Sequence, residues 1–183
     1  MTQEFDYANC DEKSLWRHVA WHLHSHGYSV VLVGGAAGVV HSGLAFRSGD
    51  LDLLIERGTR AELNAVLIEL GFRLDGRHLA HPHCPHLIVE WVYPPLGIGA
   101  STDVQVEEQP YRGQVLQVLS PTDAVCDRLA SAIHFHARDC MLQAELIVRN
   151  ADVDLDRVRC WCEGEGPGGR EAFDDLGRRL GRD

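Results

Sequence analysis

One stretch, residues 30–55, constrains the fold of this chain more than any other part of it. An apolar, β-branched run at 28–33 leads into Gly34-Gly35 and a series of small residues. A second apolar run follows at 51–55, next to Asp50 and containing Asp52. The two apolar runs predict buried strands, and the small residues between them predict a short helix packed closely against a sheet. The stretch therefore predicts a strand–helix–strand unit with two carboxylates on its second strand.

The two aspartates of this unit predict a cation site. Asp50 and Asp52 are separated by one residue, and alternate residues of a strand point to the same face. Neighbouring carboxylates repel each other unless a cation lies between them, and a set of oxygen ligands suits Mg²⁺, which water and substrate phosphates usually complete. Gly34 and Gly35 would offer backbone N–H groups and room for a phosphate at the start of a helix. A solvated carboxylate pair and a tight turn made for packing are the alternative interpretations.

The remaining pattern predicts an α+β protein. Apolar spacing and end signals predict helices over 11–26 and 59–70, the first capped by Asp11 or Ser14 and the second by Thr59 with Glu62. Further strands are expected over 86–93 and 113–119, further helices over 122–136, 139–149, 154–162 and 170–180, and a flexible turn over 163–170. Strands dominate the first two thirds and helices the last third. We therefore expect a mixed sheet flanked by helices in a core of residues 1–119, followed by a helical subdomain of residues 120–183.

Composition excludes several classes of protein. The 183 residues carry a formal net charge of −10, which disfavours a broad nucleic-acid-binding surface. No stretch is long and apolar enough for a membrane span, and the acidic, polar N-terminus is unlike a signal peptide, so we expect a cytoplasmic protein without a membrane partner. The six cysteines are then expected to be reduced thiols, mostly in the core.

A cluster of histidines and one cysteine leaves two interpretations. His81, His83, Cys84 and His86 fall within six residues, and such a tract could bind Zn²⁺. Two prolines stiffen the segment, and four ligands so close in sequence rarely surround a tetrahedral ion. The pattern therefore favours a polar loop before the 86–93 strand.

The ordered set of strand, Gly34-Gly35, small helix and Asp50-Leu51-Asp52 resembles the nucleotidyltransferase (polymerase-beta-like) fold. The run from Arg47 to Asp52 resembles the abortive-infection toxin branch of the AbiEii and MenA type, and the chain is most similar to this toxin-like branch and to the uncharacterised nucleotidyltransferase branches. Residues 120–132 and the pair Arg138-Asp139 are similar to later motifs of those toxins, with Arg128 and Arg138 standing where the toxins usually have lysine. The resemblance covers roughly residues 28–150.

The resemblance implies a set of site residues. Asp50, Asp52 and Glu90 would hold Mg²⁺, with room for a two-metal site; a salt bridge from Glu90 to a nearby arginine is the alternative, and Asp103 and Glu107 compete as third carboxylate. The nucleotide-binding residues implied are Gly34, Gly35, Arg47, Ser48, Arg128 and Arg138. Arg47 and Ser48 could equally be ordinary loop residues, and Arg128 and Arg138 could form ion pairs on helix surfaces.

The resemblance also implies an activity. It is the transfer of a nucleoside monophosphate from an NTP to a hydroxyl acceptor, on a tRNA 3′ end, a protein or a small molecule, in a protein that has an antitoxin-like partner. A catalytically weak nucleotide-binding module of the same fold is an alternative function. A small-molecule adenylyltransferase of the aminoglycoside type is another, because residues 152–175 are acidic.

Overall fold

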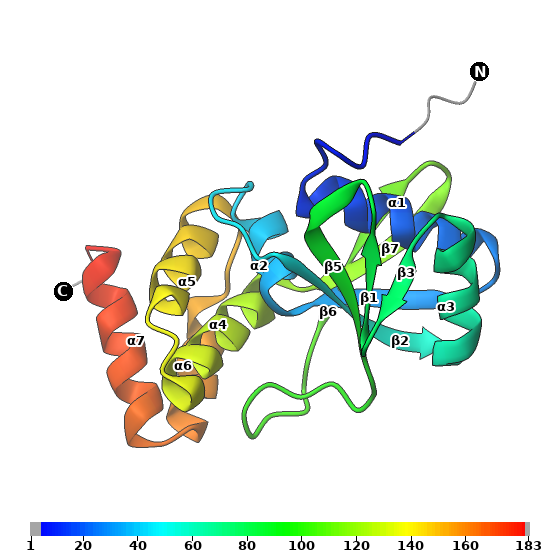
Figure 1. Ribbon diagram of the computed structural model, residues 1–183. Coiled ribbons are helices and arrows are strands. Elements are labelled where there is room, and N and C mark those ends of the chain that lie inside the picture. The colour runs from blue at the N-terminus through cyan, green and yellow to red at the C-terminus, as the bar shows by residue number, and fades with distance from the viewer. Residues whose placement is uncertain (1–4, 182–183) are drawn as a thin grey trace. The chain divides into compact units, whose positions relative to one another are not determined.

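The structure is a computed structural model that describes residues 5–181, and this part of the chain holds seven strands and seven helices (Figure 1). The strands are β1 (Ser29–Val33), β2 (Asp50–Arg57), β3 (Arg73–Asp75), β4 (His78–His81), β5 (Cys84–Val92), β6 (Val106–Tyr111) and β7 (Gln114–Leu119). The helices are α1 (Glu12–Ser25), α2 (Gly34–His41), α3 (Arg60–Glu69), α4 (Pro121–Phe135), α5 (Asp139–Asn150), α6 (Leu155–Gly164) and α7 (Pro167–Arg179).

The strands form one mixed sheet in the order β3-β4-β5-β2-β1-β7-β6. β2 lies at its centre, antiparallel to β1 and parallel to β5, while β1 also pairs in parallel with β7. The expected α+β class with a mixed sheet is therefore confirmed, and the strand that carries the aspartate pair is its middle strand.

The chain divides into two compact units. The first comprises the described residues up to Ala36 together with 47–94 and 108–118. In it, α1 packs on β1, β2 and α3 (Figure 1). Its core consists of large apolar side chains with no solvent exposure, among them Leu15, Trp16, Leu32, Leu51 and Leu53.

The second unit comprises 37–46, 95–107 and the described residues from Leu119 onward. Within it α4 packs against α5, α6 and α7, and the buried His41 ring lies 2.7 Å from the carbonyl oxygen of Leu119 through Nε2. Both units draw on residues from before and after position 95, and the domain boundary between residues 119 and 120 stays a prediction.

Helix starts follow the expected signals. Asp11 caps α1 by accepting a hydrogen bond from the Ser14 backbone N–H at 2.7 Å. Thr59 and Glu62 form the expected capping box of α3, and Ser120 caps α4. Each cap satisfies backbone N–H groups that the first turn of a helix leaves unpaired. Local chemistry thus determines where these helices begin.

Three strands and one helix start depart from the sequence expectations. β3, β4 and β6 were not expected: β3 is fully exposed, and β6 lies at the sheet edge, where Pro110 is tolerated. The flexible turn over 163–170 is wrong, because α6 extends to Gly164 and Pro167 begins α7. Proline suits the first turn of a helix, since its missing N–H would have no partner there.

The histidine- and cysteine-rich segment is also not a loop. β4 ends at His81, Pro82 and His83 form the turn, and Cys84 begins β5, so the segment is a β-hairpin. The Cys84 side chain is buried, whereas His86 is exposed. The two prolines of the segment favour an irregular loop, so the sequence pattern does not indicate the two-residue turn.

All six cysteines are free thiols, and five of them are buried, as expected. None of the helices in residues 5–181 is both long and apolar enough to cross a lipid bilayer.

Candidate metal–nucleotide site

The aspartate pair lies at the start of β2, on one face of the sheet. Asp50 and Asp52 are half-buried, while Leu51 and Leu53 between and after them have no exposure and point to the other face. This alternation follows from the two-residue period of a strand. β2 therefore presents two carboxylates together while its aliphatic side chains build the core.

Asp52 lies directly against the start of α2. Val33, the last residue of β1, pairs with Asp52, and the next residue, Gly34, has φ +63°. A Cβ atom at Gly34 would lie 2.3 Å from Asp52 Oδ2, a separation that real Cβ atoms do not show. Glycine is thus needed at this position for two reasons, the left-handed backbone and the space that the carboxylate occupies.

The contact places the Asp52 carboxylate near the positive end of the α2 helix dipole. The first backbone N–H groups of a helix have no partner within it and carry partial positive charge, which favours an anion nearby. Gly35 is buried in the same first turn. The turn after β1 therefore places one carboxylate and the first backbone N–H groups of α2 in the same small region.

A short network holds Asp50 and the loop before it. The Ser48 hydroxyl donates to Asp50 Oδ1 at 2.6 Å, and the Ser48 backbone N–H donates to Glu12 Oε1 at 2.9 Å. Arg47 Nη1 lies 3.2 Å from Glu12 Oε2, and the Glu12 side chain is only 1% exposed. Glu12, in the first turn of α1, therefore fixes the loop that delivers Asp50, and its buried negative charge is compensated by Arg47.

Glu90 stands beside Asp52 on the neighbouring strand. In the parallel pairing of β2 with β5, Asp52 is the register partner of Glu90, so both side chains leave the sheet on the same face. We call Asp50, Asp52 and Glu90 the carboxylate face. Glu90 Oε1 lies 3.5 Å from Arg77 Nε and 4.0 Å from His78 Nδ1, both from the β3–β4 hairpin. The salt-bridge alternative for Glu90 is thus the arrangement seen in this structure.

The carboxylate face matches Mg²⁺ in its chemistry. Its donors are oxygens only, and Asp50 and Asp52 share a face at a helix start that would attract phosphates. Among the described residues, however, these three side chains do not bring one ligand atom each to within 4.8 Å of one another. Asp50 and Asp52 fit Mg²⁺ by donor type and shared face, while Glu90 is engaged by Arg77 in this structure.

The other expected nucleotide-binding residues lie in the second unit. The Arg128 guanidinium is paired with Asp127 Oδ2, with 3.1 Å from Nε, and also donates to Gln143 Oε1 at 3.3 Å. Arg138 is exposed at the start of α5. Of the competing acidic residues, Asp103 and Glu107 also belong to this unit. The phosphate-binding roles of both arginines stay predictions.

Two residues of the first-unit site were missed by sequence reasoning. Glu12 is 36 residues before Ser48, and Arg77 lies on a hairpin that was not expected at all. The available signal for Glu12 was weak: an acidic residue just after a helix cap is ordinarily explained by the helix dipole. Only the fold shows that its carboxylate is buried against the 47–48 loop.

Comparison with known proteins shows the fold. No family model matches the chain, and no curated protein matches it. The crystal structure of an antigenic nucleotidyltransferase-like protein from Paracoccidioides brasiliensis is similar, with a TM-score of 0.62 and 15% identity over 94% of this chain and 89% of that chain. A likeness at this identity shows the architecture alone, and the chain has a nucleotidyltransferase-like fold.

Proposed function

We propose that this protein is a Mg²⁺-dependent nucleotidyltransferase that moves a nucleoside monophosphate from an NTP to a hydroxyl acceptor. The observation that carries the proposal is the contact between Asp52 and Gly34. It places a carboxylate from the middle strand against the first turn of α2, where a side chain on Gly34 would collide with it. A structural turn alone would not require a carboxylate in that place.

Within this proposal each residue has a separate task. Asp50 and Asp52 would hold the ion, and the N–H groups at Gly34 and Gly35 would bind phosphate oxygens of the NTP. Bound Mg²⁺ would neutralise charge on the triphosphate and on the leaving pyrophosphate. Ser48 keeps Asp50 in place through its 2.6 Å hydrogen bond, so the carboxylate meets the ion with little reorganisation.

Glu90 would act as the third carboxylate. In that role it would accept the proton of the attacking hydroxyl, which requires its carboxylate to leave Arg77. The acceptor would be a tRNA 3′ end, a protein or a small molecule. The Arg47–Asp52 run supports a toxin of the AbiEii and MenA type, controlled by an antitoxin-like partner, as the finer form of the proposal.

Calorimetric titration with each of the four NTPs, with and without Mg²⁺, tests the proposal. We expect one NTP to bind only with Mg²⁺, and the Asp50→Asn/Asp52→Asn variant to weaken that binding by about 100-fold or more, because the ion loses both of its fixed ligands. Asp156→Asn, which removes a carboxylate that is 84% exposed in the second unit, is the matched control and should bind normally. Equal binding by the double variant would contradict the proposal.

A second function is favoured by the ion pair of Glu90. With its third carboxylate held by Arg77, the fold would bind Mg²⁺ and NTP but transfer poorly, as a regulatory module that engages a partner. The two functions separate in the same experiment followed by incubation with labelled NTP. Binding with label transfer to an RNA or protein acceptor supports the enzyme, and binding without transfer to any acceptor supports the module.

A further inference from the structure

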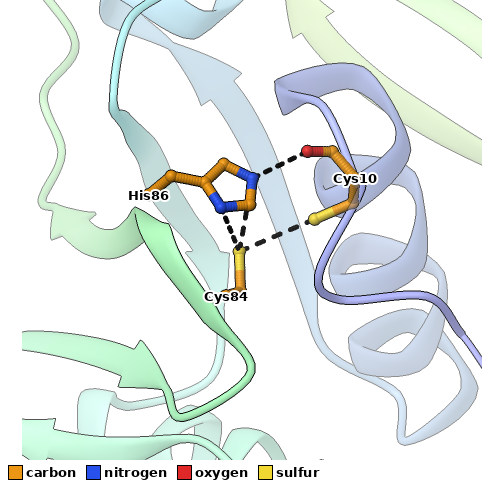
Figure 2. A group of neighbouring side chains, drawn as sticks. All are labelled: Cys10, Cys84 and His86. Carbon is orange, nitrogen blue, oxygen red and sulfur yellow. Dashed lines mark hydrogen bonds between the residues drawn. The ribbon is translucent and has the colours of Figure 1, made fainter.

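A second group of metal-ligating side chains lies in the first unit, apart from the carboxylate face. It consists of Cys10, Cys84 and His86, which we call the Cys–His cluster (Figure 2). Cys10 stands in the segment before α1, while Cys84 and His86 belong to the start of β5. One ligand atom from each lies within 4.8 Å of the others. The fold thus joins residues that are more than 70 positions apart.

The distances match those of a tetrahedral thiolate and imidazole site. Cys10 Sγ and Cys84 Sγ are 3.6 Å apart, and Cys84 Sγ lies 4.0 Å from His86 Nδ1. Zinc–sulfur bonds of about 2.3 Å and zinc–nitrogen bonds of about 2.0 Å at tetrahedral angles put two sulfurs about 3.8 Å apart and a sulfur and a nitrogen about 3.5 Å apart. The two separations that involve Cys84 would therefore need to change by only a few tenths of an ångström.

The hydrogen bonding of His86 prepares it as a ligand. Its Nε2 lies 2.8 Å from the carbonyl oxygen of Cys10, which can only accept, so Nε2 carries the proton and donates (Figure 2). When the ring is neutral its lone pair is then on Nδ1, while Cys84 Sγ lies beside the ring, 4.0 Å from Nδ1 and 3.9 Å from Nε2. Metal-bound histidines commonly donate their other N–H to a carbonyl in this way, which fixes both the tautomer and the ring orientation.

Burial and charge favour a soft divalent cation. Cys10 is 6% exposed and Cys84 is fully buried, so a cation with two thiolates and a neutral imidazole would form a site of zero net charge there. His86 is exposed, which leaves solvent access for a fourth ligand such as water. Sulfur and imidazole donors select Zn²⁺ over the Mg²⁺ that suits the carboxylate face.

We propose that Cys10, Cys84 and His86 bind one Zn²⁺, which fastens the segment before α1 to the β4–β5 hairpin. Each thiol gives one proton to solvent as its sulfur binds the ion. The site rests on its own geometry and is independent of the proposed transferase activity. It also revises the expected set of zinc candidates, because Cys10 replaces His81 and His83.

The test is metal binding by the full chain, first freed of metal by a chelator and kept reduced. Titration with Zn²⁺ should show one tight equivalent and release of protons, because each thiol must lose its proton to bind the ion as a thiolate. Titration with Co²⁺ should give the visible absorption of thiolate-bound, tetrahedral cobalt.

Variants separate this site from others. Cys84→Ser and His86→Ala should each lower Zn²⁺ affinity by about 100-fold or more; since His86 is exposed, its variant should fold normally even if Cys84→Ser does not. Cys160→Ser removes the exposed thiol and should bind normally. His26→Gln disrupts the separate group of His22, His26 and Glu69 and should also leave the tight equivalent in place.

Three outcomes would overturn the proposal. They are no Zn²⁺ binding at micromolar concentration, tight binding that survives His86→Ala in a folded protein, and a Cys10–Cys84 disulfide found by mass spectrometry in protein purified with mild reductant. The last would make the two thiols a redox pair instead of metal ligands.

Discussion

The carboxylate face and the Cys–His cluster share the strand β5 but differ in how they are held. On the carboxylate face, Glu90 faces Arg77 and Asp50 accepts from Ser48, so charged oxygens are balanced by protein partners. In the cluster, two buried thiols and an imidazole lie close together with no charged partner among the three. Under the two proposals, the carboxylate face would take an ion that arrives with a phosphate substrate, and the Cys–His cluster would take an ion that stays bound.

Of the substitutions that distinguish the two regions, one at Gly34, at the start of α2, should have the largest effect on ligand binding. We expect Gly34→Ala to abolish Mg²⁺-dependent NTP binding, because its Cβ must displace Asp52, while Zn²⁺ binding at the Cys–His cluster stays unchanged. Calorimetry with both ions measures this. Gly76→Ala is the matched control, since Gly76 has a similar φ of +60° but nothing within 4 Å of an added Cβ. It should cost about 1 kcal/mol of stability and leave NTP binding intact. Equal loss in both variants would show that backbone strain, not the carboxylate, is responsible.

The ion pair of Glu90 should have the next largest effect. We expect Glu90→Gln to slow nucleotide transfer by about 100-fold while NTP affinity changes little, because it removes a proton acceptor without removing the two fixed ligands. Arg77→Ala frees Glu90 and should preserve or raise transfer, with a stability change below about 0.5 kcal/mol, since Arg77 is 85% exposed. Single-turnover assays check both variants. Slower transfer by the Arg77→Ala variant would indicate that Arg77 itself binds the substrate.

The smallest effect concerns the segment that carries Cys10. Tyr7 in this segment hydrogen-bonds His18 Nε2 at 3.0 Å, and burial lowers the pKa of His18 to about 4. His18 is neutral in the folded state, whereas the unfolded state takes up a proton below about pH 6.5. Its contribution is therefore complete above pH 6.5 and is lost as pH falls toward 4.

Urea unfolding at pH 7 and pH 5 measures that contribution. With partial exposure taken into account, the wild type should lose about 1 kcal/mol more stability between these pH values than His18→Gln, which keeps a hydrogen-bonding side chain without the titration. An equal loss in both proteins would show that other groups control the acid sensitivity of this segment.

The sequence predicted the parts of the site that are close together in the chain. Asp50 and Asp52 share a strand, and Gly34 directly follows another, so periodicity alone placed them. Glu12 and Cys10 could not be assigned in this way, because the 36 residues from Glu12 to Ser48 and the 74 from Cys10 to Cys84 are bridged only by tertiary packing.

The same distinction holds for the strands. β1 and the core of β2 were predicted because they are apolar and buried. β3 and β6 are exposed or partly exposed and polar, so their pairing partners, not their own residues, make them strands. Strand registers, which place Glu90 beside Asp52, are not contained in a local pattern at all.

The irregular pairing of β5 determines where the strand can tolerate an insertion or a deletion. From Ile88 to Val92 the strand pairs with β2 residue by residue, but its pairing with β4 jumps from Ile88 to Cys84 and skips the three residues between. A residue gained or lost among 85–87 can be absorbed by this bulge, whereas one gained between 88 and 90 would turn Glu90 away from Asp52. A length change at 85–87 would therefore alter the spacing of Cys84 and His86 and leave the pairing of Glu90 with Asp52 in place.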